Sequence, residues 1–221
     1  MKINPATSAE LFISTGCIHC PVVLQKLSDD LKSGKLSSLK IINIAVDNER
    51  ANKLNIRSVP WFSFTNGNSF MIFSGQHSPK EIQQWLTTSQ SDNGMQDYIA
   101  EHLKTGQLTT INQAIQIEPE VFSHVIAMIK DEETSMDLRI GLDVLVENFA
   151  TTEILQQYSD VLKAIISSGS ERLKIDALHY IALTGDLANR DFLQEQTHNT
   201  NNQIKEAAIE ALETLEDLLD N

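Results

Sequence analysis

The sequence predicts an α/β domain over residues 1–90, followed by an all-helical domain over residues 91–221. Short apolar runs alternate with helical patterns in the first part, whereas the second part shows helical spacing throughout. The charge changes at the same place. Residues 1–90 carry nine Lys and Arg against six Asp and Glu, and residues 91–221 carry eight against 24. This change in character indicates two domains that meet near residues 89–94.

The first domain is predicted to follow the order β-α-β-α-β-β-α. Asn66-Gly67-Asn68 separates two apolar runs and predicts a hairpin. Ser78-Pro79-Lys80-Glu81 predicts a helix start, with Ser as the N-cap and Glu at the third helical position. The predicted strands are 10–14, 39–46, 61–65 and 69–74, and the predicted helices are 20–33, 49–55 and one that opens at 78. This order requires a mixed sheet with a parallel crossover and a terminal hairpin.

The second domain is predicted to contain helices joined by short linkers. Their ranges are 95–105, 108–116, 119–130, 135–149, 152–167, 171–183, 188–196 and 202–219. A similar pattern starts at Leu138-Arg139, Leu173-Lys174 and Ile204-Lys205, with offsets of 35 and 31 residues. A near-fixed period favours a solenoid of stacked helix pairs. A helical bundle without repeats is the alternative, because amphipathic helices give partly similar spacing.

Composition excludes several classes of protein. With 41% hydrophobic residues the chain can bury a core, so it is not wholly disordered. No stretch approaches the 18 uncharged apolar residues of a transmembrane helix, and MKINPATSAE lacks the apolar region of a secretory signal. We therefore expect a cytoplasmic protein without a membrane partner. The acidic second half, residues 91–221, argues against a nucleic-acid partner, because such affinity rests on Lys and Arg.

Both cysteines lie in the segment Gly16-Cys17-Ile18-His19-Cys20-Pro21, between a predicted strand and a predicted helix. The first thiol then lies at a helix N-terminus, where free N–H groups and the helix dipole stabilise a thiolate. Cys20 lies one turn further, close enough to close a disulfide. Such a pair can attack a disulfide and then release itself by internal attack. We expect the pKa of Cys17 to be lowered by the helix start and by a protonated His19.

Two other interpretations of the cysteine pair stay open. The pair with His19 would also suit half of a zinc site, but a closed site needs four ligands and the chain has no second cysteine pair. Distant histidines, carboxylates or a second chain would have to complete it. Two inert, buried cysteines are the other alternative, because free cysteines are commonly buried.

Pro60 follows Cys17 by 43 residues and stands at the start of a predicted strand, in Ser58-Val59-Pro60-Trp61. It either separates a helix from a strand or forms a cis bond packed next to the thiols. With these motifs, residues 9–87 resemble thioredoxin-fold proteins. The run of residues 17–23 is most similar to the glutaredoxin-like domain at the N-terminus of the alkyl hydroperoxide reductase flavoprotein. A histidine between the thiols is also similar to the strongly oxidising periplasmic disulfide oxidases.

The resemblance implies thiol–disulfide exchange, with Cys17 as the nucleophile and Cys20 as the resolving thiol. Pro60 would lie next to the bound substrate chain, flanked by Val59 and Trp61. No cofactor beyond the Cys17–Cys20 disulfide and no metal is implied, and the partners would be a protein client and a thiol electron donor or acceptor. Three residues depart from the thioredoxin pattern and favour a narrower substrate range: Gly16 replaces a Trp, Leu11 a buried Asp, and Trp61 a small residue or Thr.

Residues 95–219 resemble HEAT-like repeats of the short bacterial form, which implies a concave surface that binds proteins. We interpret His102, His124, His179 and His198 as surface or hydrogen-bonded helix residues, and the acidic end (Glu213, Glu216, Asp217 and Asp220) as a solvated face. The leading hypothesis is a cytoplasmic thiol–disulfide oxidoreductase whose helical domain positions a protein client. The alternative is an adaptor that senses redox state without turnover.

Overall fold

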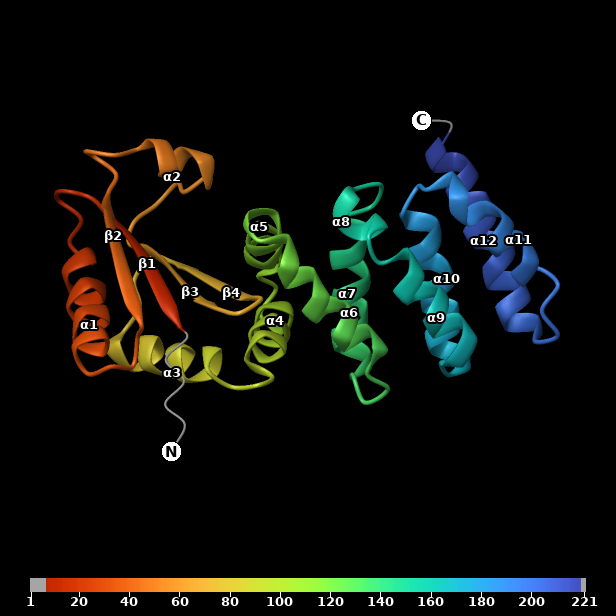
Figure 1. Ribbon diagram of the computed structural model, residues 1–221, viewed down its shortest axis with the longest axis horizontal. Coiled ribbons are helices and arrows are strands. Elements are labelled where there is room, and N and C mark those ends of the chain that lie inside the picture. Colours follow the sequence, from red (N-terminus) through yellow and green to blue (C-terminus); the bar gives the residue numbers. More distant parts are fainter. Residues whose placement is uncertain (1–6, 220–221) are drawn as a thin grey trace. The chain divides into compact units, whose positions relative to one another are not determined.

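The computed structural model describes residues 7–219, and Figure 1 shows the course of the chain. The chain divides into two compact units, Met1–His124 and Val125–Asn221. The first six residues of the predicted α/β domain and Asp220 of the predicted acidic end lie outside the described residues. The division of the chain at residue 90 into domains stays a prediction.

A four-stranded mixed sheet forms the framework of the first unit. Its strands are β1 (Ser8–Ile13), β2 (Ser38–Asn43), β3 (Trp61–Asn66) and β4 (Ser69–Ser74). They are ordered β2-β1-β3-β4, with β1 and β2 parallel and the other neighbours antiparallel. The predicted parallel crossover and terminal hairpin are thereby confirmed. The layout is compatible with the thioredoxin-like order that the sequence predicts.

Five helices accompany this sheet. They are α1 (Cys20–Lys32), α2 (Glu49–Lys53), α3 (Pro79–Ser89), α4 (Gly94–Lys104) and α5 (Leu108–Ile117). Helices α1 and α3 contact each other and the sheet, and they lie along the same side of it in Figure 1. The predicted start of α3 is confirmed: Glu81 N–H donates to Ser78 Oγ at 3.2 Å, and Ser78 N–H donates to Glu81 Oε2 at 2.7 Å.

Helix α4 closes the outer edge of β4. The Tyr98 hydroxyl accepts a hydrogen bond from Ile72 N–H at 3.2 Å and donates one to the Ile72 carbonyl at 2.7 Å. The Tyr98 ring is fully buried and contacts Phe73 and Trp85 edge to face, with ring centroids 5.6 and 5.5 Å away. The compact unit therefore includes helices α4 and α5, which follow the predicted α/β domain.

The elements of residues 119–219 are all helical. The elements are η1 (Pro119–Val121), α6 (Phe122–Lys130), α7 (Met136–Glu147), α8 (Glu153–Gln156), α9 (Ser159–Ser168), α10 (Glu171–Leu183), η2 (Leu187–Asn189), α11 (Arg190–Gln196) and α12 (Asn202–Leu219), where η marks a 3₁₀ helix. The three predicted repeat starts fall in α7, α10 and α12, and α10 contacts both of the others. This packing is compatible with stacked helix pairs, and the repeats stay a prediction.

Several predicted elements have different bounds in the structure, and for two of them local hydrogen bonds show why. The predicted strand 39–46 is wrong beyond Asn43, because the N–H groups of Val46 and Asp47 both turn back to the Asn43 carbonyl, at 3.0 and 2.9 Å. The predicted helix 152–167 is split into α8 and α9. The Ser159 hydroxyl donates to the Gln156 carbonyl at 2.8 Å, a local bond that competes with the helical pattern. Within residues 7–219, no helix has the length and apolar character that crossing a membrane requires.

Candidate redox site

The two cysteines form a disulfide in the turn between β1 and α1. Their Cα atoms lie 5.5 Å apart. The turn is held by Cys17 N–H, which donates to the Ser14 carbonyl at 3.2 Å. Cys20 is the first residue of α1, and its N–H donates to Cys17 Sγ at 3.1 Å. Because the first N–H groups of a helix have no partner within the helix, this contact directs a helix-start donor at the sulfur that the sequence predicts to be the nucleophile.

The two sulfurs differ in access from solvent. Cys17 is half-buried, whereas Cys20 is 4% exposed. The residues between them are exposed, and Ile18 in particular is 81% exposed. A reactant from solvent therefore reaches Cys17 more readily than Cys20.

The loop before β3 lies against the first sulfur. The Val59–Pro60 peptide bond is cis, as predicted. The Val59 carbonyl oxygen lies 3.6 Å from Cys17 Sγ, although 42 residues separate the two in sequence. Val59 is half-buried and Pro60 is buried. The structure thus brings together Cys17, Cys20 and the predicted proline loop.

The structure assigns no role at the site to His19 or to Trp61. His19 is the exposed N-cap residue of α1, and its side chain makes no capping hydrogen bond. Trp61 is 2% exposed, and its ring meets Phe12 edge to face at 5.3 Å between centroids. The parts predicted for them, stabilisation of the thiolate by His19 and contact with substrate by Trp61, stay predictions.

The structure shows the surroundings of two of the three residues that depart from the thioredoxin pattern. Gly16 has a φ of 100°, in the region that favours glycine, so the backbone itself disfavours a tryptophan there. Leu11 is fully buried in β1 and offers no carboxylate to the interior of the sheet. A proton that leaves Cys20 at this site must therefore pass to water or to another group.

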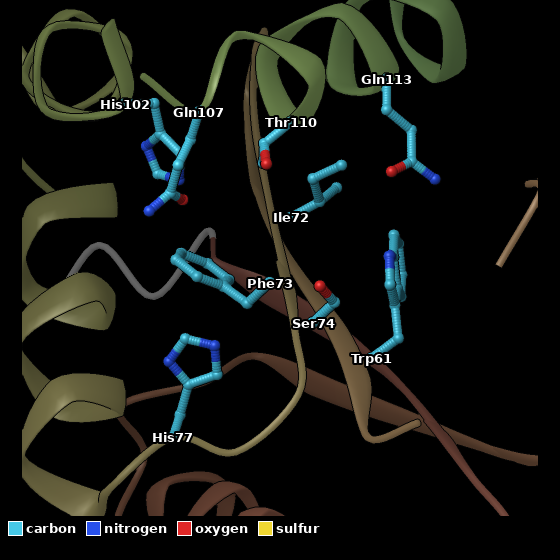
Figure 2. A pocket seen from close by; sticks show the side chains of 9 residues that line it. All are labelled: Trp61, Ile72, Phe73, Ser74, His77, His102, Gln107, Thr110 and Gln113. Carbon is cyan, nitrogen blue, oxygen red and sulfur yellow. The ribbon is translucent and has the colours of Figure 1, made fainter. Parts of the chain in front are cut away.

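Beside the proline loop lie two hollows that share Trp61, Ser74 and Gln113. We call them together the α5 trough. The larger hollow, of about 420 Å³, begins at Arg57 and Ser58 and runs along α5. The smaller, of about 90 Å³, reaches His77 and His102 (Figure 2).

His102 forms the far wall of the trough and is 7% exposed. Its Nδ1 lies 2.8 Å from the Tyr98 carbonyl, an acceptor, so Nδ1 carries the proton and Nε2 has the free lone pair. Burial lowers the pKa of His102, which favours the neutral ring. The sequence interpretation of this residue as a surface or hydrogen-bonded helix residue missed its place in a hollow. Apolar spacing gives no signal for such a place.

The second unit has a hollow of its own, of about 440 Å³, lined by Asp143, Asp176 and Glu210 among others. The Tyr180 hydroxyl donates to Asp143. Burial, reinforced by the charge of Asp143, raises the pKa of Asp176. Across residues 7–219, no group of three or more His, Cys, Asp or Glu side chains is placed to hold a metal ion.

Comparison with known proteins assigns no family. The chain matches no model of a protein family, and no curated protein matches it as a relative. The functional interpretation therefore rests on the geometry around Cys17 and Cys20.

Proposed function

We propose that the protein is a thiol–disulfide oxidoreductase that acts on protein clients. One observation carries the proposal: the more exposed sulfur of the Cys17–Cys20 pair receives a helix-start N–H and lies beside the Val59 carbonyl. A paired sulfur at a helix start, open to solvent on one side, suits attack by or on a thiolate. Cys17 is the nucleophile in this proposal, and Cys20 is the resolving thiol.

Exchange proceeds in two displacements. In the reduced protein the Cys17 thiolate attacks one sulfur of the client disulfide. A Cys17–client S–S bond forms, the client S–S bond breaks, and the second client sulfur leaves as a thiolate. Deprotonated Cys20 then attacks Cys17 Sγ, the Cys17–Cys20 bond forms, and the first client sulfur leaves. The client gains two electrons, and both of its thiolates take protons from water.

The opposite direction uses the same steps in reverse. A client thiolate attacks the Cys17–Cys20 disulfide, and the client dithiol ends as a disulfide. A thiol electron donor in one direction, or a disulfide acceptor in the other, restores the starting state. We place the protein in the cytoplasm and propose that residues 91–221, through HEAT-like repeats, position the client.

Reduction of insulin by dithiothreitol tests the proposal. Catalytic amounts of the protein should accelerate the reaction, and Cys17→Ser should abolish the acceleration because it removes the attacking sulfur. Cys20→Ser should stop turnover and accumulate a mixed disulfide that reductant releases. An unaccelerated reaction, together with partner binding that depends on the state of the Cys17–Cys20 pair, would favour the adaptor that senses redox state instead.

A further inference from the structure

We propose that the α5 trough binds an extended segment of the client polypeptide through its main chain. The inference rests on the proposed function and names the substrate class of the same site. The occupant is the stretch of chain that adjoins the client cysteine.

The trough is continuous with the redox site. Ser58, at its near end, directly precedes Val59, whose carbonyl lies 3.6 Å from Cys17 Sγ. Trp61, two residues further, lines both hollows. A client chain joined to Cys17 and lying over the loop would therefore pass into the trough.

One face of α5 supplies the hydrogen-bonding wall. Thr109, Asn112, Gln113 and Gln116 all line the larger hollow, at the i, i+3, i+4, i+7 spacing of one helix face. Side-chain amides carry both donors and acceptors, which match the N–H and C=O groups of an extended peptide. Gln113 Nε2 is fixed by its bond to the Leu54 carbonyl at 3.2 Å. Asn112 Oδ1 is buried and has no hydrogen-bond partner among residues 7–219.

The far end offers another acceptor. His102 is more than nine-tenths buried, and its Nδ1 is occupied by the Tyr98 carbonyl. Its ring lines the smaller hollow, above Phe73 in Figure 2. No hydrogen bond of its Nε2 is found within the described part of the chain. Nε2 is therefore a free acceptor at the hollow, to which a peptide N–H can donate.

The residues that line the trough favour recognition of the client main chain rather than of charged client side chains. Among the described residues that line the two hollows, none is acidic, and Arg57 is the one with a permanent charge. Amides, hydroxyls and a neutral imidazole bond to peptide groups whatever the side chains are. The trough would therefore accept clients of varied sequence, provided that the chain near the cysteine is extended.

The test measures the attack step alone, in the reduced full-length Cys20→Ser protein. One probe is a short uncharged peptide whose single cysteine is joined to thionitrobenzoate, and the other is dithiobis(nitrobenzoate), which has no peptide. Gln116→Ala should lower the rate constant for the peptide roughly three- to tenfold, as expected for loss of a hydrogen bond. Thr109→Trp should lower it further by filling the trough. Both residues are exposed, so neither change disturbs the core.

The small disulfide and a matched variant serve as controls. Dithiobis(nitrobenzoate) should react equally with all variants. Gln84→Ala removes an exposed amide of α3 that lines neither hollow, and it should leave both rates unchanged. A peptide with N-methylated backbone groups should lose its sensitivity to Gln116→Ala.

Three outcomes would overturn the inference. If neither Gln116→Ala nor Thr109→Trp changes the rate constant for the peptide, the trough does not bind the client. An equal decrease in the rate constants for the peptide and for dithiobis(nitrobenzoate) would show that the variants act on the Cys17 thiol itself rather than on peptide binding. Failure of the parent protein to react with either probe would refute the proposed function itself, and the inference would fall with it.

Discussion

Cys17 and Cys20 differ enough in exposure to differ in reactivity. After reduction, a limiting amount of iodoacetamide should alkylate Cys17 first, because Cys20 is 4% exposed and Cys17 is half-buried. Mass spectrometry of the labelled peptides measures the order. Preferential labelling of Cys20 would contradict the assignment of the nucleophile.

His19→Ala tests the stabilisation of the Cys17 thiolate that the sequence predicts for His19. The substitution should slow the labelling of Cys17 by iodoacetamide, because a less stable thiolate is less populated. An unchanged rate of labelling would show that His19 does not stabilise it.

His102 links stability to pH. Burial lowers the pKa of its ring from the ordinary value of 6.5, so the unfolded chain binds the proton more tightly than the folded one. The free energy of unfolding should therefore fall as the pH drops below 6.5 towards the lowered value. Denaturant unfolding at several pH values measures this decline.

The matched variant is His102→Asn, whose amide can still donate to the Tyr98 carbonyl. It should flatten the decline, although its stability at neutral pH can differ from that of the parent. Burial lowers the pKa of His124 as well, so part of the slope should remain. His77 and Glu101 act on the ring with opposite signs and are unchanged in the variant. Parallel pH profiles would contradict the assignment of the slope to His102.

Arg139 joins α6 to α7 and is 5% exposed. Its guanidinium donates to the carbonyls of Ile129, Asp131 and Thr134, at 3.3, 2.6 and 3.1 Å. These carbonyls lie at and beyond the end of α6, where the helix offers them no donors. Arg139→Met should destabilise the protein by roughly 1–3 kcal/mol, because it leaves these partly buried acceptors unpaired and removes the ion pair with Asp176, 3.5 Å away.

The control comes from the predicted repeat. Lys205 occupies the position in α12 that corresponds to Arg139 and is exposed, so Lys205→Met should change stability little. Midpoints of urea denaturation compare the two variants. Similar midpoints would show that the polar contacts of Arg139, to the carbonyls and to Asp176, contribute no net stability.

Local signals were enough to predict most elements of the fold. The hairpin at Gly67 and the start of α3 at Ser78 depend on neighbouring residues, and both are confirmed. The break before Ser159 was missed, because the apolar spacing continues through it while one hydroxyl captures a helix carbonyl. The packing of α4 on β4 joins Tyr98 to Ile72 across 26 residues, a contact without a local signature.

The candidate site likewise contains residues that the sequence predicts and residues that only the structure reveals. The cysteine pair and Pro60 are short motifs, so the sequence alone was enough to single them out. The polar face of α5 was not predicted to matter, because a polar helix face is typical of one exposed to water. Only the position of α5 beside Trp61 makes Gln113 part of a hollow.

The two compact units differ in charge. Residues 125–221 carry seven Lys and Arg against 19 Asp and Glu, whereas residues 1–124 carry ten against 11.

If the second unit positions clients, a Cys20→Ser chain that ends at His124 should trap fewer or different proteins in cells than the full Cys20→Ser chain. Mass spectrometry of the disulfide-linked complexes identifies them.

Cys17→Ser should trap far less in either length of chain, because it lacks the attacking sulfur. Equal yields of the same proteins with and without residues 125–221 would refute the positioning role and leave the exchange chemistry intact. The shorter chain ends at residue 124 rather than near residue 90 so that α4 and α5 are kept.

The Tyr98 hydroxyl also has a consequence for association between copies of the chain. By engaging both the N–H and the C=O of Ile72, it occupies the place where a foreign strand would add to the sheet. A fragment that stops near residue 90 would present β4 as a bare edge, and Phe73 and Trp85 would lose their ring contacts with Tyr98. Such an edge is a template for intermolecular sheets, so one side chain on α4 helps to keep β4 from polymerising.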